Sequence, residues 1–145
     1  MTARALRPHH EIVTYFSRAD GRTCLAAVLL AVGAYLAYVA WLSWEHVFQI
    51  DPATGRYGGP YEAWQVMGCA ATLAVLVLAV GAFHHPVLAL VIVPIIFTVT
   101  WSIPAARYDV TGLWLVGAFL VLMGTATGTA ALAFAADALR SRMRA

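Results

Sequence analysis

Four long apolar stretches without a charged side chain constrain this chain more than any other feature. They cover residues 23–44, 63–83, 86–104 and 112–134. Each is close to the roughly 20 apolar residues that a helix needs to cross the hydrocarbon core of a bilayer. Lipid offers no partners to backbone N–H and C=O groups, so a helix, which bonds them internally, is the expected conformation of each stretch.

The composition agrees with a membrane protein. Hydrophobic residues make up 62% of the 145 residues and charged residues only 11%, whereas a soluble domain carries about 45–50% and about 25%. A chain of this length is expected to form one domain. The sequence therefore predicts an all-α integral membrane protein, a four-helix transmembrane bundle. The third stretch carries Pro94 near its middle, where we expect a kink.

The arginines predict the orientation, because basic residues accumulate on the cytoplasmic side. Seven of them flank the first and last stretches, while Arg56 and Arg107 lie between stretches. We therefore expect cytoplasmic termini (1–22 and 135–145), outer loops at 45–62 and 105–111, and a multi-pass protein of the plasma (inner) membrane of a bacterium. The seven are Arg4, Arg7, Arg18, Arg22, Arg140, Arg142 and Arg144.

The first outer loop has the pattern of a short extracytoplasmic β-hairpin. Residues 48–50 and 56–57 flank the turn-forming sequence Asp51-Pro52-Ala53-Thr54-Gly55, in which proline and glycine suit a tight turn. The two cysteines, Cys24 and Cys69, should lie roughly 20 Å apart along the membrane normal. We expect both to be free thiols buried as small apolar groups.

The sequence gives little support to catalysis or to a bound cofactor. No stretch contains an ionisable carboxylate of the kind that coupled carriers use, and no Cys-x-x-Cys pair is present. The histidines lie at or beyond the ends of the stretches, which disfavours a haem held inside the bundle. We expect no catalytic residue, no metal and no cofactor. The arginines form no aromatic-rich basic stripe, so we expect no nucleic-acid partner.

Aromatic residues gather in the half of the bundle expected to face outward, where all five tryptophans map. Tryptophan and tyrosine serve either as interfacial anchors or as contacts that bury a large area and keep a polar group. Both interpretations remain open: a one-sided anchoring belt, or a docking surface for a partner or an amphipathic ligand. The candidate surface comprises Trp44, Glu45, His46, Tyr57, Tyr61, Glu62, Trp64, Trp101 and Arg107.

Small residues repeat along one face of the fourth stretch. Gly117, Gly124, Gly128 and Ala131 are spaced by 7, 4 and 3 residues, which places them on one helical face. Such a face lets another helix approach closely. The partner is either a helix of the same bundle or a helix of a second copy or another membrane protein.

Hydroxyl groups in the third and fourth stretches also allow two interpretations, helix packing or a polar conduit. They belong to Thr98, Thr100, Ser102, Thr125, Thr127 and Thr129.

Three hypotheses about function follow from these patterns. The first is a non-enzymatic small membrane protein that acts through protein–protein or lipid interaction, as a homo-oligomer or an accessory subunit. The alternative is a small homo-oligomeric transporter or channel. The least favoured is an enzyme acting on lipid at the outer leaflet through Glu45, His46 or Glu62. The expected partners are membrane lipids, further copies of the chain or another membrane protein.

Overall fold

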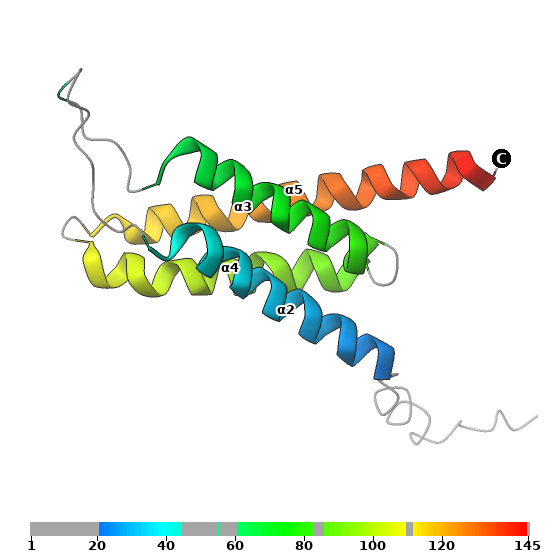
Figure 1. The fold of residues 1–145 in the computed structure, drawn as a ribbon, viewed down its shortest axis with the longest axis horizontal. Coiled ribbons are helices and arrows are strands. Elements are labelled where there is room, and N and C mark those ends of the chain that lie inside the picture. Colours follow the sequence, from blue (N-terminus) through cyan, green and yellow to red (C-terminus); the bar gives the residue numbers. More distant parts are fainter. Residues whose placement is uncertain (1–20, 45–54, 56–60, 83–85, 110–111, 145) are drawn as a thin grey trace, which may run out of the picture.

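The structure is a computed structural model that describes residues 21–44, 55, 61–82, 86–109 and 112–144. Within these residues every regular element is helical (Figure 1). The elements are α2 (Gly21–Leu42), α3 (Ala63–Leu76), the π-helix η1 (Val77–Ala82), α4 (Pro86–Tyr108) and α5 (Trp114–Arg144).

Four helical segments are long and apolar enough to cross a membrane. They are Gly21–Leu42, Ala63–Val80, Pro86–Tyr108 and Trp114–Leu139. This confirms the prediction of an all-helical protein with four candidate spans, and the fold is that of a multi-pass membrane bundle.

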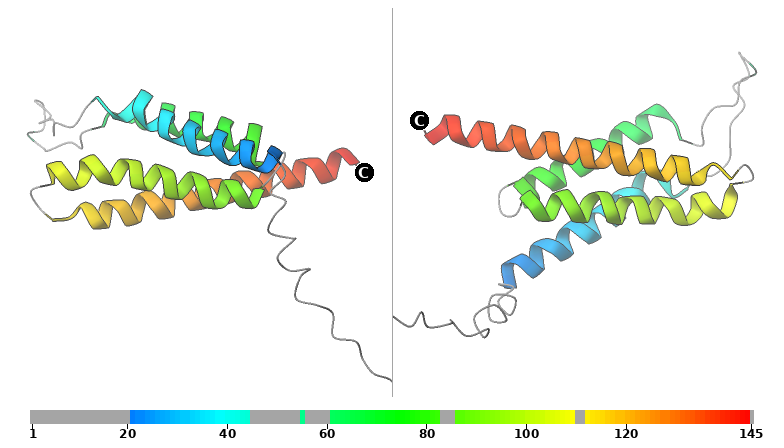
Figure 2. Two further views of the ribbon diagram at one scale, coloured as in Figure 1. Left: turned by 90° about the horizontal axis from the view of Figure 1, so that it is seen from below. Right: turned by 180° about the vertical axis from the view of Figure 1, so that it is seen from behind.

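The helices form two layers, with α2 and α3 in one and α4 and α5 in the other (Figure 2). Helix α4 packs against both α2 and α5, whereas α3 and α5 touch each other little. The start of α2 and the end of α5 lie at the same end of the bundle (Figure 1). The opposite end carries Trp41, Trp44, Trp64, Trp101 and Trp114, and we call it the tryptophan end.

One face of α2 supplies much of the core. Leu30, Ala34, Ala37 and Tyr38 recur at helical spacing and are at most 5% exposed, against Val77, Val93 and Phe97 of the other elements. The small side chains bring α3 close, and a Cβ on Gly33 would lie only 2.7 Å from a methyl carbon of Leu76. The α2–α3 layer therefore depends on residues that occupy almost no volume.

Two helices run further than the apolar stretches predicted. Helix α4 continues through Pro104 to Tyr108, since a proline removes one backbone donor without forcing the helix to end. Helix α5 continues ten residues past residue 134 to Arg144, because eight of these ten residues are alanine, leucine, arginine or methionine, all strong helix formers. Residues 105–108 of the predicted loop and 135–144 of the predicted tail are thus helical.

Smaller corrections concern the other boundaries. Helix α2 occupies residues 21–42 rather than 23–44, and the second stretch changes from α-helix to π-helix at Val77. Helix α4 runs without a break across Pro94, and the kink expected there stays a prediction. The predicted β-hairpin lies outside the described residues, apart from Gly55, and stays a prediction.

Both cysteines are free thiols, as predicted. Cys69 is buried, and its thiol donates to the carbonyl of Ala37 at 3.8 Å. Cys24, however, is exposed on α2, so the prediction that both thiols would be buried is wrong for this one.

Candidate functional site

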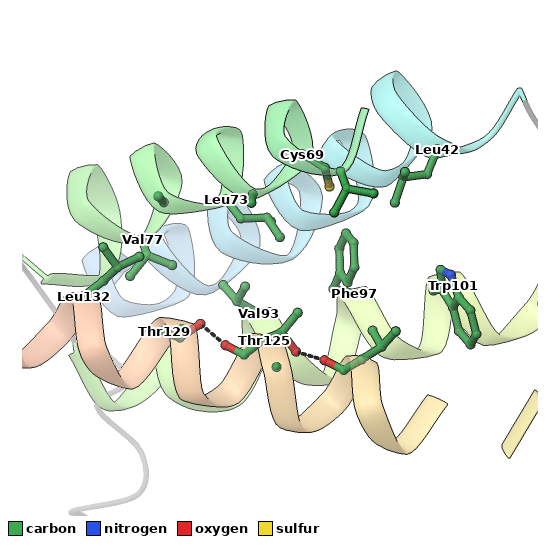
Figure 3. Close-up of a pocket in the computed structure, with 16 residues that line it drawn as sticks. Leu42, Cys69, Leu73, Val77, Val93, Phe97, Trp101, Thr125, Thr129 and Leu132 are labelled. Carbon is green, nitrogen blue, oxygen red and sulfur yellow. Dashed lines mark hydrogen bonds between the residues drawn. The ribbon is translucent and has the colours of Figure 1, made fainter. Parts of the chain in front are cut away.

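An apolar opening among the spanning helices lies where α3 and α5 touch each other little. It is a cavity of about 330 Å³ between α3, α4 and α5, which we call the α3–α5 groove (Figure 3). Its floor includes Val93 and Phe97 of α4, and its walls include Leu73 of α3 and Gly124 and Gly128 of α5. Its lining is almost wholly apolar, so its occupant in a membrane must be apolar as well.

The glycines of the predicted small-residue face divide into two groups. A Cβ on Gly117 would lie 2.6 Å from Cη2 of Trp101, so this glycine receives a side chain of α4. A Cβ on Gly124 or Gly128 would have no neighbouring atom within 4 Å. The part of the face nearer the start of α5 is therefore used for packing inside the bundle, and the part at Gly124 and Gly128 is open.

Helix α5 is the least covered of the spanning helices. Only 6% of its span is buried, against 22% for the α3–η1 span, 22% for α4 and 33% for α2. Between residues 124 and 133 each exposed position carries a small side chain, namely Gly124, Thr127, Gly128 and Ala131. Nearer the start of α5 the exposed positions carry large apolar side chains, such as Phe119 and Leu120.

The hydroxyl groups beside the groove are mostly occupied within their own helix. Thr125 donates to the carbonyl of Val121 at 2.7 Å, and Thr129 to that of Thr125 at 2.7 Å (Figure 3). Thr100 and Ser102 of α4 likewise donate to carbonyls four residues earlier. The threonine hydroxyls that line the groove, Thr125 and Thr129, are therefore not free to donate to an occupant of the groove.

The tryptophan end is organised around Trp41. Its indole N–H donates to the hydroxyl of Thr72 at 3.0 Å, and its ring meets that of Trp64 edge to face at 6.1 Å. Trp44 donates to the carbonyl of Trp41 at 2.8 Å. Trp41 was absent from the predicted surface. The signal that could have found it is Gly68, whose missing side chain makes room for the indole ring.

The structure distributes the other predicted surface residues among different roles. The side chain of Gln65 accepts a hydrogen bond from the backbone N–H of Glu62 at 2.7 Å, and the Glu62 carboxylate accepts from the indole of Trp64 at 2.5 Å. Glu62 is thus held in local contacts at the start of α3. Tyr61 packs against the core, and burial raises the pKa of its phenol above the ordinary value.

Trp101 is half-buried between α4 and α5. Glu45, His46 and Tyr57 lie outside the described residues, so their grouping with the others stays a prediction. Arg107 lies apart, on the α2–α4 side. The predicted residues therefore do not form a single described site. Within the part of the chain that the structure describes, no three His, Cys, Asp or Glu side chains gather.

A second cavity lies at the tryptophan end, between α2 and α4. It has a volume of about 340 Å³, and its lining includes Tyr35, Tyr38, Thr100, Arg107 and Tyr108. We call it the α2–α4 crevice. The tyrosines of α2 were not among the predicted site residues, although their spacing of three already placed them on one helical face.

Fold and cavities together define a class: a small multi-pass helical membrane protein with an open apolar groove. Comparison of the chain with protein-family models, with curated proteins and with solved structures gives no match.

Proposed function

We propose that this protein is a non-enzymatic membrane component that acts by self-association, with a helix of a second copy seated at the α3–α5 groove. The observation that carries the proposal is the open space above Gly124 and Gly128. The atoms around this space lack van der Waals partners on one side, so a helix placed there would add contacts that the single bundle does not make.

The size of the exposed residues favours a helix over a lipid chain. Bulky apolar side chains already make good contact with lipid, as on the first turns of α5. Small residues at a spacing of four instead bring two helix backbones together, where van der Waals contact between them stabilises the pair. Gly124 and Gly128 have this spacing, and the exposed Ala131 follows three residues later on the same face.

A second copy suits this surface because the small-residue face complements itself. A two-fold axis beside α5 would place Gly124 and Gly128 of one copy against the same residues of the other, as an isologous interface requires. The exposed part of α5 that projects past the bundle (Figure 1) would extend the same contact.

The proposed location is the plasma (inner) membrane, with both chain ends in the cytoplasm. The positive-inside rule supports this orientation, since Arg22 and Arg142 lie at the end of the bundle opposite to Arg107. The tryptophan end would then face outward.

A matched pair of substitutions tests the self-association. Ala131 on α5 and Ala71 on α3 are both exposed alanines of a span, but only the first lies on the open small-residue face. We expect Ala131→Leu to weaken dimerisation about tenfold or more, or roughly 1.4 kcal/mol, and Ala71→Leu to leave it unchanged. The measurement is the dissociation constant in mild detergent, followed by fluorescence transfer between labelled copies.

Two results would contradict the proposal. The first is a wild-type protein that stays monomeric at every protein-to-detergent ratio. The second is an equal loss of dimer in both variants, which would show that the small residues of α5 have no special part in association.

A further inference from the structure

The α2–α4 crevice differs from the groove in having polar groups at one end. Arg107 lies in the last turn of α4, and within the described part of the chain its guanidinium takes part in no hydrogen bond or ion pair. Arginine presents several donors in a planar fork that suits phosphate and carboxylate groups. An exposed arginine without a partner among the described residues, placed at a membrane interface, is therefore an available anion contact.

Tyrosine hydroxyls add donors on the α2 side. The side chain of Tyr38 lines the crevice and is only 5% exposed. Its hydroxyl is buried and has no hydrogen-bond partner of ordinary geometry among the described residues, and the hydroxyl of Tyr61 is its polar neighbour. Tyr35, one helical turn earlier, is half-exposed on the same wall.

The hydroxyls of Ser43 and Thr100 are already used. They donate to the carbonyls of Val39 at 2.6 Å and Ile96 at 2.7 Å. Tyr108 makes a contact of its own. Among the described lining residues, the donors left for an anion are thus the Arg107 guanidinium and the hydroxyls of Tyr35 and Tyr38.

The crevice is also open sideways, toward the lipid. Val39 of α2 is 38% exposed and Ile103 of α4 is 53% exposed, and both line it. A ligand with a charged head near Arg107 could therefore lay an apolar chain along these residues. A free inorganic anion would gain nothing from this apolar wall, so the crevice suits an amphiphile.

We infer that the α2–α4 crevice binds a phospholipid with an anionic headgroup, its phosphate held by Arg107 and its acyl chain lying between Val39 and Ile103. This inference does not depend on the proposed self-association, because the crevice and the α3–α5 groove share no lining residue.

The test uses the full-length protein reconstituted into vesicles of equal amounts of phosphatidylglycerol and phosphatidylcholine. After extraction in mild detergent, the lipids that stay bound are measured by mass spectrometry. We expect phosphatidylglycerol to be retained preferentially. Arg107→Gln should lower that preference about tenfold, Tyr38→Phe should lower it a few-fold, and Arg107→Lys should restore part of it because the charge is kept.

Arg142→Gln is the matched control, since Arg142 is an exposed arginine on α5 at the other end of the bundle. It should leave the lipid preference unchanged. The inference is overturned if both lipids are retained equally, or if Arg107→Gln behaves like the control. It is also overturned if inorganic phosphate displaces the lipid at low concentration, because the crevice would then be a site for free anions.

Discussion

Two glycines of this protein are each matched with a tryptophan ring of a neighbouring helix. A Cβ on Gly68 would lie 2.5 Å from Cζ3 of Trp41, and one on Gly117 would lie 2.6 Å from Cη2 of Trp101. The missing side chains create the space that the indole rings fill. At these two positions the glycine is required by close approach rather than by backbone conformation.

The Gly68 contact can be tested by adding a single methyl group. Trp41 is held by its hydrogen bond to Thr72, so its ring cannot move aside without losing that bond. We expect Gly68→Ala to destabilise the folded protein by about 1–3 kcal/mol, the usual cost of an overpacked core. The measurement is reversible unfolding in a denaturing detergent.

Gly21→Ala is the control for that experiment, since nothing lies within 4 Å of a Cβ at the start of α2. It should be neutral or slightly stabilising. If Gly68→Ala proved equally harmless, Trp41 would not be packed against α3 as described.

At the scale of the elements, local contacts decide where helices begin. The carboxylate of Asp109 accepts a hydrogen bond from the backbone N–H of Trp114 at 2.7 Å, and this satisfies one of the free donors at the start of α5. A negative charge there also interacts favourably with the helix dipole. Asp109 thus joins the end of α4 to the start of α5.

We expect Asp109→Ala to destabilise the protein by about 1 kcal/mol, because α5 loses its capping acceptor. Asp109→Asn should cost less, since the amide oxygen can still accept. Asp137→Ala is the comparison, because Asp137 is exposed far along α5. The same unfolding measurement applies, and equal stability of Asp109→Ala and Asp137→Ala would show that the cap contributes nothing.

At the scale of the whole molecule, the two-layer arrangement leaves one side of the bundle open. Helix α4 contacts both α2 and α5, while α3 and α5 are separated by the groove. If all four candidate spans cross a membrane, the start of α2 and the end of α5 lie on one side of it and the tryptophan end on the other. The bundle therefore has only two possible orientations in a membrane: the tryptophan end faces either outward or inward.

Cysteine labelling decides between them. Ala106, at the tryptophan end of α4, and Ser141, near the end of α5, are both exposed. In a variant in which Cys24 is replaced by Ser and Cys69 by Ala, we expect Ala106→Cys to react with a membrane-impermeant maleimide added to intact cells. Ser141→Cys should react only after permeabilisation. The reverse pattern would invert the proposed orientation.

The apolar stretches by themselves determined the helical class and the number of candidate spans, because the cost of unpaired backbone groups in lipid leaves a helix as the economical conformation. They could not set the ends of α4 and α5, since hydropathy marks where lipid ends and not where helical hydrogen bonding ends.

The tertiary structure alone decided which small residues are used inside the bundle. Gly117 and Gly124 belong to the same repeat in the sequence, yet one receives Trp101 and the other faces open space. The difference depends on which side chains of the neighbouring helices reach α5: the ring of Trp101 on α4 reaches Gly117, and no atom lies within 4 Å of a Cβ at Gly124. A one-dimensional pattern of small residues carries no such distance.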